Sequence, residues 1–324
     1  MSDSRGSPAS ESDSSRWSRI AERGSLWGMR FTVWCYRTFG PRPVSVLVQL
    51  IAAYFFVTDA AGRHASRAYL RRVAATSAGR RALGRRPNAW ASLQRYRCFG
   101  LAILDRLAIW AGRTDDFDFV VQGNEHCDRL AEERRGGIVL SAHLGNFDAL
   151  RLLAERQQRI VHVLMFTAHA QRINTIFREL SPGVDLNVIE VDPASARTAL
   201  EIRERVECGE LVAILADRVE PGDRGRTSQV PFLGGMIELP RAPFLLAGIL
   251  GCPVLLMLAF RTGWGRYAMF TEKLTDGMQL SRREREKGAT ELLTAYAGRL
   301  EHYCTAYPYQ WFNFYDYWGD EASR

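Results

Sequence analysis

Short apolar runs rich in branched residues alternate with helix-like segments from about residue 117 onward, and this alternation limits the fold more than any other feature. The runs are Gly137–Ala142, Ile160–Phe166, Leu186–Val191, Leu211–Ala216 and Pro253–Phe260. The helix-like segments are Phe147–Arg159, Ala170–Leu180, Ala194–Cys208 and the late segment Arg282–Tyr303. Continuous apolar strands that alternate with helices are typical of a largely parallel sheet with helices on both faces. The sequence therefore predicts an α/β domain over residues 117–324.

The N-terminal part differs in character from the rest. Residues 1–16 are mostly small and polar and predict a disordered tail without a signal peptide. Leu26–Phe39 is crowded with aromatic residues, and Pro43–Thr58 holds sixteen residues without a charge. As a helix, this stretch is about 24 Å long, shorter than the ~30 Å hydrocarbon core. It would cross with its aromatic flanks at the interface, lie in one leaflet, or be a core helix of a soluble domain. We predict a helical membrane anchor over residues 17–60.

A basic helical segment is expected next, over residues 61–116. Between Gly62 and Leu104 the chain has no acidic residue and ten arginines, at positions 63, 67, 71, 72, 80, 81, 85, 86, 95 and 97. Such a segment suits anionic lipid headgroups, nucleic acid or a phosphate-bearing substrate, and a solvated helical face is the alternative. Nucleic-acid binding is not expected, because no DNA- or RNA-binding motif accompanies the arginines. Since the arginines follow the apolar stretch, the positive-inside rule places the bulk of the protein on the cytoplasmic side.

The cysteines and the standard catalytic motifs narrow the chemistry. The six cysteines form no CxxC pair and no zinc-ligand spacing, which indicates reduced, mostly buried thiols and no metal site. The sequence also lacks a GxSxG elbow and the glycine-rich loops that bind nucleotide phosphates. A serine-hydrolase mechanism and nucleotide-dependent chemistry are therefore not expected.

The segment Ser141–Asp148 is the strongest candidate for chemistry. On one continuous helix His143 and Asp148 would point about 140° apart, but a turn between strand end and helix start lets them meet. Gly145 suits a close approach of backbone or substrate, and Asn146 suits the N-cap of the following helix. A carboxylate beside an imidazole orients it as a general base. We predict that Asp148 orients His143 in this way; a structural histidine that caps a turn is the alternative.

His143–Asp148, with the sequence HLGNFD, resembles the His-x4-Asp/Glu block of the lipid A biosynthesis (lauroyl/myristoyl) acyltransferase family, within the lysophospholipid acyltransferase superfamily. Further segments resemble that family in the same order, so the resemblance covers about residues 20–318. They are Arg23–Ser25, Ser66–Leu70, Leu215–Arg218, Gly222–Gly234, Leu239–Leu258 and Gln310–Asp316.

The resemblance implies an acyltransferase at the cytoplasmic side of the cell inner membrane. It would move a fatty acyl group from an acyl carrier protein or coenzyme A thioester to a hydroxyl or amine of a lipid-like acceptor. Lipid A precursors, related glycolipids, aminolipids and polyene lipids are the acceptor classes to consider. No cofactor or metal is implied beyond the thioester co-substrate. A non-catalytic lipid-binding or assembly protein on the same scaffold is the alternative.

The resemblance also assigns roles to residues. His143 becomes the base and Asp148 its orienting acid. Backbone amides near Gly145–Phe147 are expected to stabilise the oxyanion, and Gly145 and Asn146 are candidates for substrate binding. Arg218 is expected to bind a phosphate or carboxylate of the substrate, with a structural salt bridge as the alternative. The remaining substrate-binding candidates are Asp217, Arg224 and Arg226, although a GDRGR loop is equally well a solvated turn.

Overall fold

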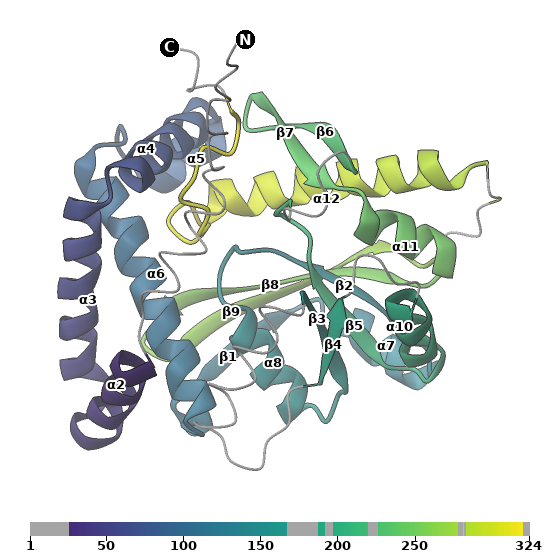
Figure 1. The fold of residues 1–324 in the computed structure, drawn as a ribbon, viewed down its shortest axis with the longest axis horizontal. Coiled ribbons are helices and arrows are strands. Elements are labelled where there is room, and N and C mark those ends of the chain that lie inside the picture. The colour runs from purple at the N-terminus through teal and green to yellow at the C-terminus, as the bar shows by residue number, and fades with distance from the viewer. Residues whose placement is uncertain are drawn as a thin grey trace, which may run out of the picture.

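A seven-stranded sheet with the strand order β1-β9-β8-β2-β5-β3-β4 forms the centre of the molecule (Figure 1). The computed structural model describes residues 26–166, 187–191, 197–219, 226–277, 281 and 283–319. The strands of the sheet are β1 (Asp118–Gln122), β2 (Gly137–Ser141), β3 (Val161–Phe166), β4 (Val188–Val191), β5 (Leu211–Leu215), β8 (Val254–Gly263) and β9 (Arg266–Thr275). The expected tail 1–16 and the expected helix Ala170–Leu180 lie outside the described residues.

The sheet is mostly parallel, as the sequence predicts. Strands β8, β2, β5, β3 and β4 pair in parallel with their neighbours, and each corresponds to one of the five apolar runs. Strand β9 turns back antiparallel to β8, and β1 pairs in parallel with β9. The α/β prediction is therefore confirmed. The sequence did not predict β1 and β9, because along both strands exposed and more buried positions alternate and no continuous apolar run forms.

Helices cover both faces of the sheet. Successive side chains of a strand point to opposite faces, so a strand that is apolar at every position has two faces to bury. Leu140 of β2 belongs to a buried cluster with Phe244 and Tyr296 on one face. Its neighbour Val139 points to the other face, into a cluster with Leu130. The helices that carry these contacts and their neighbours are α7 (Glu125–Glu132), α8 (Phe147–Arg156), α10 (Arg197–Glu207), α11 (Ala242–Leu250) and α12 (Arg285–Ala306).

A two-stranded antiparallel hairpin, β6 (Thr227–Phe232) and β7 (Gly235–Pro240), lies over α12 at the upper edge of Figure 1. The amide of Leu233, in the turn between the two strands, donates to the Glu301 carboxylate of α12 over 2.5 Å. This contact fastens the hairpin to the helical layer. The sequence did not predict the hairpin.

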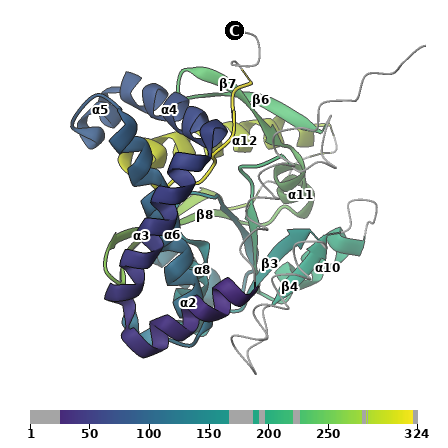
Figure 2. The ribbon, with the colours of Figure 1, turned by 60° about the vertical axis from the view of Figure 1, so that its left-hand side comes forward.

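The N-terminal helices form a layer beside the sheet, as Figures 1 and 2 show. They are α2 (Leu26–Phe39), α3 (Pro41–Thr58), α4 (Ala60–Ala75), α5 (Ser77–Leu83) and α6 (Ala89–Trp110), followed by a short 3-10 turn η1 (Thr114–Asp116). Their starts follow local chemistry, since Asp59, Thr76 and Asn88 each accept a hydrogen bond from an amide of the helix they begin. Helices therefore make up most of residues 26–110, whereas the predicted anchor over 17–60 and the predicted basic segment over 61–116 stay predictions as domains.

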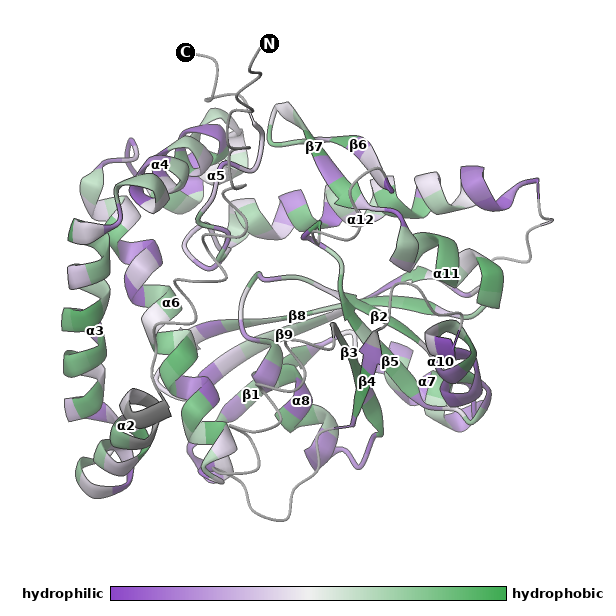
Figure 3. Ribbon diagram, in the orientation of Figure 1, coloured by the Kyte–Doolittle hydropathy of each residue, from purple (hydrophilic) through white to green (hydrophobic). Residues whose placement is uncertain are grey.

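Helix α3 is packed along one side and open on the other. Within the described residues it is the one helix long and apolar enough to cross a membrane. On its packed side it lies close to α6, since a Cβ at Gly100 would be 2.9 Å from a Val48 methyl. On its open side Val46, Leu50 and Tyr54 are exposed, and Figure 3 shows α3 as largely apolar. Their spacing of four residues forms a single apolar stripe on the helix.

The arginines of the basic segment do not all face solvent. Arg67, Arg71, Arg80 and the other exposed arginines lie on α4, on α5 and in the residues that follow α5. Arg95, in contrast, is fully buried on α6. Arg95 therefore does not contribute to the exposed basic surface of this segment. The six cysteines are all unpaired, as predicted, and four of them are buried.

Candidate active site

The side chain of His143 lies against the carboxylate of Asp217 at the carboxyl edge of the parallel sheet. Strands β2 and β5 are neighbours, and their register pairs Ser141 with Leu215. His143 and Asp217 each follow two residues later, so the two strand ends bring them side by side. The Nδ1 atom of His143 lies 2.8 Å from Oδ1 of Asp217, and the His143 amide donates to the same oxygen over 3.0 Å.

The turn after His143 depends on Gly145. Its φ of +83° lies in the left-handed region, and a Cβ at this position would lie 2.0 Å from the Ala259 carbonyl oxygen. The Gly145 amide donates to Gln310 O and the Asn146 amide to Ala259 O, each over 2.8 Å. Both amides therefore have partners within the protein. For these two amides this corrects the expected role in stabilising an oxyanion, and Gly145 and Asn146 shape the turn instead. For the amide of Phe147 that role stays a prediction.

Helix α8 begins directly after this turn. The side chain of Asn146 accepts a hydrogen bond from the Asp148 amide over 3.1 Å, as the predicted N-cap requires. Its amide nitrogen donates to the Tyr267 hydroxyl over 2.9 Å, and that hydroxyl donates to Asp105 over 2.6 Å. Asn146 therefore fixes the start of α8 to β9 and α6.

Asp148 does not orient His143, and this is the main correction to the sequence-based site. Its carboxylate accepts from Nε of Arg106 over 2.5 Å and from Nε1 of Trp110 over 2.7 Å. Both partners lie on α6, which packs against α8. Because Asp148 lies in the first turn of α8, these two donors direct its carboxylate toward α6. The carboxylate that lies beside His143 is that of Asp217, at the end of the neighbouring strand β5.

The second oxygen of the Asp217 carboxylate is held from the C-terminal part of the chain. Nε1 of Trp311 donates to Oδ2 over 3.2 Å, and Nδ2 of Asn313 donates to it over 3.0 Å. The Asp217 side chain is fully buried, whereas the imidazole of His143 keeps 28% of its surface exposed. The pair therefore consists of a buried acid with both oxygens hydrogen-bonded and a base that solvent can reach.

The electrostatics favour a neutral imidazole and an ionised carboxylate. Burial and the nearby charge of Arg218 lower the pKa of His143 below 6.5, against the opposing effect of Asp217. Burial raises the pKa of Asp217, but His143 and Arg218 outweigh it and hold that pKa below its usual range. Since an ionised carboxylate only accepts hydrogen bonds, the proton of the neutral ring lies on Nδ1 and Nε2 is left as an acceptor.

Arg218 lies in the site without an acidic partner among the described residues. Its Nε donates to Oδ1 of Asn313 over 2.7 Å, and a terminal amine donates to Phe312 O over 3.1 Å. The alternative of a structural salt bridge thus has no support within the described residues. Arg226 directly precedes the hairpin, and its side chain is exposed. It makes no side-chain hydrogen bond or ion pair with another described residue. Arg224 lies outside the described residues.

Sequence reasoning missed four residues of the site: Arg106 and Trp110 on α6, and Trp311 and Asn313 near the C-terminus. Each pair acts by donating to a carboxylate of the site, Asp148 or Asp217. A signal for the second pair was present, because Gln310–Asp316 resembles a family segment. No pattern in α6 distinguishes Arg106 from the arginines before it.

A second histidine–carboxylate pair lies at the opposite edge of the sheet. Nε2 of His162, at the start of β3, is 2.7 Å from a carboxylate oxygen of Glu210, which directly precedes β5. Its imidazole is 9% exposed, compared with 28% for His143. The pair therefore fits the structural role that its position in an apolar strand indicates.

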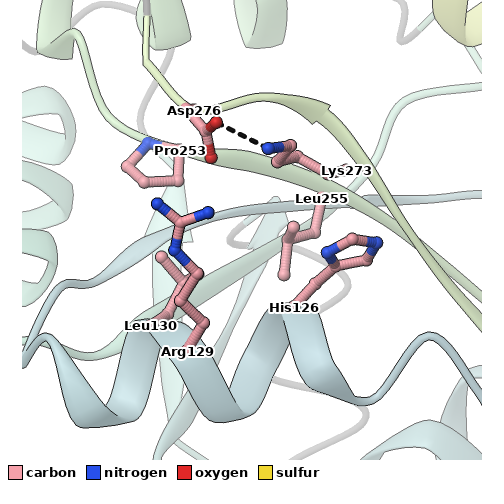
Figure 4. A pocket seen from close by; sticks show the side chains of 7 residues that line it. All are labelled: His126, Arg129, Leu130, Pro253, Leu255, Lys273 and Asp276. Carbon is pink, nitrogen blue, oxygen red and sulfur yellow. Dashed lines mark hydrogen bonds and ion pairs between the residues drawn. The ribbon is translucent and has the colours of Figure 1, made fainter.

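A small pocket also lies at the amino end of β8 rather than beside His143 (Figure 4). Its walls include the ion pair of Lys273 with Asp276, at 2.6 Å, together with His126, Arg129, Leu130, Pro253 and Leu255. Among the described residues no carboxylate is hydrogen-bonded to His126, in contrast to His143. No cluster of three or more His, Cys, Asp or Glu side chains able to hold a metal ion occurs in the described part of the chain.

Comparison with known proteins assigns a family to most of the chain. A family model described as bacterial lipid A biosynthesis acyltransferase matches residues 14–319, which is nearly the whole chain. A comparison with curated proteins found no match. The matched region includes the N-terminal helices, the sheet and the C-terminal residues around Asp217.

Proposed function

The chain belongs to the bacterial lipid A biosynthesis acyltransferase family and is an acyltransferase, and on that premise we propose that His143 is its general base. The family implies an acyl thioester donor and a lipid-like acceptor. The donor in our proposal is a fatty acyl group on an acyl carrier protein or on coenzyme A. The acceptor is a hydroxyl or amine of a lipid A precursor or a related glycolipid, aminolipid or polyene lipid.

The observation that carries the proposal is the contact of 2.8 Å between His143 and Asp217. With Nδ1–H donated to a buried carboxylate, the ring is fixed in orientation and tautomer. Its lowered pKa keeps it neutral at pH 7 and ready to accept a proton through Nε2. A base of this kind activates a hydroxyl or amine without a covalent enzyme intermediate.

The reaction then has two steps. In the first, Nε2 removes the proton of the acceptor while the acceptor oxygen or nitrogen attacks the thioester carbonyl carbon. In the second, the tetrahedral intermediate collapses, the carbon–sulfur bond breaks, and the imidazolium returns the proton to the departing thiolate. Asp217 stabilises the imidazolium between the two steps. The products are the acylated acceptor and the free thiol of the donor.

Two arginines give the surroundings of His143 a positive charge. The charges of Arg218 and Arg106 both act on the imidazole and help lower its pKa, after burial. Arg106 keeps 38% of its side chain exposed, so its terminal amines can reach a ligand while Asp148 holds its Nε. We assign both arginines to an anionic group of the substrate, a phosphate or carboxylate near the reacting atoms.

The family is membrane-associated, and we propose that α3 lies in the interface of the cytoplasmic leaflet of the inner membrane and does not span it. Its packed side follows α6, which carries Arg95, Asp105 and Arg106 and belongs in a polar setting. Its exposed stripe, which includes Leu50 and Tyr54, faces away from the protein. A helix with one apolar open side and one side fixed to a folded domain suits the plane of the interface.

Lipid profiles of cells that express the wild-type protein or His143→Ala test the catalytic role by mass spectrometry. The wild type should produce a lipid heavier by one acyl group, and the substitution should lower its rate of formation by about 10² to 10⁴. His162→Gln is the matched control, because it changes a histidine–carboxylate pair outside the site. An unchanged acylated species in a folded His143→Ala protein would show that another residue is the base.

A further inference from the structure

The carboxylate of Asp217 is completed by a segment that lies almost one hundred residues further along the chain. We call Gln310–Asn313 the strap. Trp311 and Asn313 both donate side-chain hydrogen bonds to Oδ2 of Asp217, over 3.2 and 3.0 Å. The opposite oxygen accepts from His143. The strap therefore occupies the side of the carboxylate that faces away from the base.

The strap is also bound to the backbone of the turn that carries the imidazole. The Phe312 amide donates to His143 O, and the Gly145 amide donates to Gln310 O, each over 2.8 Å. Asn313 adds a contact to the substrate side, because its Oδ1 accepts from Nε of Arg218 over 2.7 Å. One short segment thus touches the base, its acid and the neighbouring arginine.

A buried cation fixes the strap from α6. Arg95 is fully buried and donates to Trp311 O over 2.5 Å and to Asn313 O over 3.0 Å. Its guanidinium lies 4.4 Å from the ring centroid of Tyr69 and 4.7 Å from that of Phe314. It has no carboxylate partner in the described ranges, so strap carbonyls and aromatic faces offset part of the cost of its burial, while its Nε and second terminal nitrogen make no hydrogen bond. Because the buried guanidinium of Arg95 binds two carbonyls of the strap, it holds the strap in position.

We propose that Trp311 and Asn313 are positioning residues, which hold the Asp217 carboxylate in place and set the basicity of His143 through it. This rests on the proposed role of His143. Hydrogen bonds to Oδ2 stabilise the carboxylate charge and draw it away from Oδ1. Without one of them, the carboxylate attracts the imidazolium more strongly, so the pKa of His143 rises and the base is protonated at a higher pH.

Trp311→Phe tests this with little change in packing. The indole is fully buried against Tyr69 and Phe232, and a phenyl ring keeps apolar contact with both. Trp318→Phe is the matched control, because Nε1 of Trp318 donates to Phe232 O and not to Asp217. Asn313→Ala is the second variant, since the carbonyl that Arg95 binds remains.

Two readouts separate this proposal from the proposed function. The first is kcat and KM against pH: Trp311→Phe and Asn313→Ala should each lower kcat about tenfold and move the acid limb of the pH profile up by about half a pH unit. KM should stay unchanged in Trp311→Phe, whereas Asn313→Ala also releases Nε of Arg218. The second is hydrogen–deuterium exchange at Cε1 of His143, followed by mass spectrometry, which measures the imidazole pKa without any activity. Trp318→Phe should match the wild type in both.

An imidazole pKa in Trp311→Phe and Asn313→Ala equal to that of Trp318→Phe would overturn the proposal, even if His143→Ala is inactive. An active His143→Ala would instead overturn the proposed function, and the exchange measurement would still decide whether the strap sets the pKa of His143. If one variant does not fold, the other decides by the same two measurements.

Discussion

At the scale of single residues, the structure distinguishes two acids, Asp217 and Asp148, which the sequence both offers as candidate site residues. Asp217 is fully buried and bonded to His143, whereas Asp148 is bonded to Arg106 and Trp110. The first acid acts on the base, and the second acts on an arginine beside it. Substitution of each by its amide should therefore have different consequences.

Asp217→Asn should lower kcat by about 10³ to 10⁴, because an amide no longer fixes the ring tautomer or stabilises the imidazolium. Asp148→Asn should act mainly on KM, since it releases Arg106 from its ion pair and leaves the His143 contact intact. Steady-state kinetics of the two variants at one pH separate these effects. Equal losses of kcat would contradict the division of roles between the two acids.

The pH dependence follows from the lowered pKa of His143. Burial first, and then the charge of Arg218, lower that pKa below 6.5. Since the neutral ring is the base, kcat/KM should be constant near pH 7 and fall at lower pH with a midpoint below 6.5. Arg218→Gln removes one of the causes that lower this pKa, so the midpoint of the variant should move to a higher pH. Arg203→Gln, at an exposed arginine of α10, is the control; a shift of equal size there would contradict a local effect.

At the scale of elements, the turn between β2 and α8 decides whether the site forms. Gly145 combines a φ of +83° with a distance of 2.0 Å between the Cβ of any substituted residue and Ala259 O, whereas Gly234 has a φ of +74° and open space around it. Gly234→Ala should therefore cost about 1 kcal/mol of unfolding free energy for the backbone alone. Gly145→Ala adds a clash with backbone and should cost clearly more, with loss of activity. Denaturant unfolding of both variants measures the difference, and equal costs would show that the turn relaxes.

Most of the sheet could be predicted from the sequence, because a buried parallel strand needs a continuous apolar run. The acid that pairs with His143 could not be predicted in the same way. His143 and Asp217 each directly follow a predicted strand, but β3, β4 and the helices α8 and α10 lie between these two strands in the sequence. Strand order decides which strand ends become neighbours, and it depends on packing of the whole sheet. The proximity of His143 and Asp148 in the sequence therefore favoured the wrong partner.

At the scale of the whole molecule, the exposed stripe of α3 should decide membrane binding. Leu50→Glu should weaken binding to vesicles with anionic lipids at least tenfold, because burial of one leucine contributes about 1.5 to 3 kcal/mol and a charge opposes it. Leu200→Glu is the matched control, at an exposed leucine of α10 outside this stripe. Vesicle flotation measures both. Unchanged flotation of Leu50→Glu would place the membrane contact elsewhere.

Helix α6 contacts both α3 and the active site. The rotation of the helix between these two contacts fixes the direction of one relative to the other. Gly100 faces Val48 of α3, and Arg106, less than two turns further on, faces Asp148. One residue inserted between them would turn one half of α6 relative to the other by about 100° and lengthen it by about 1.5 Å. With α3 in the membrane interface, as we propose, the number of residues between Gly100 and Arg106 therefore sets the angle between the active site and the lipid surface.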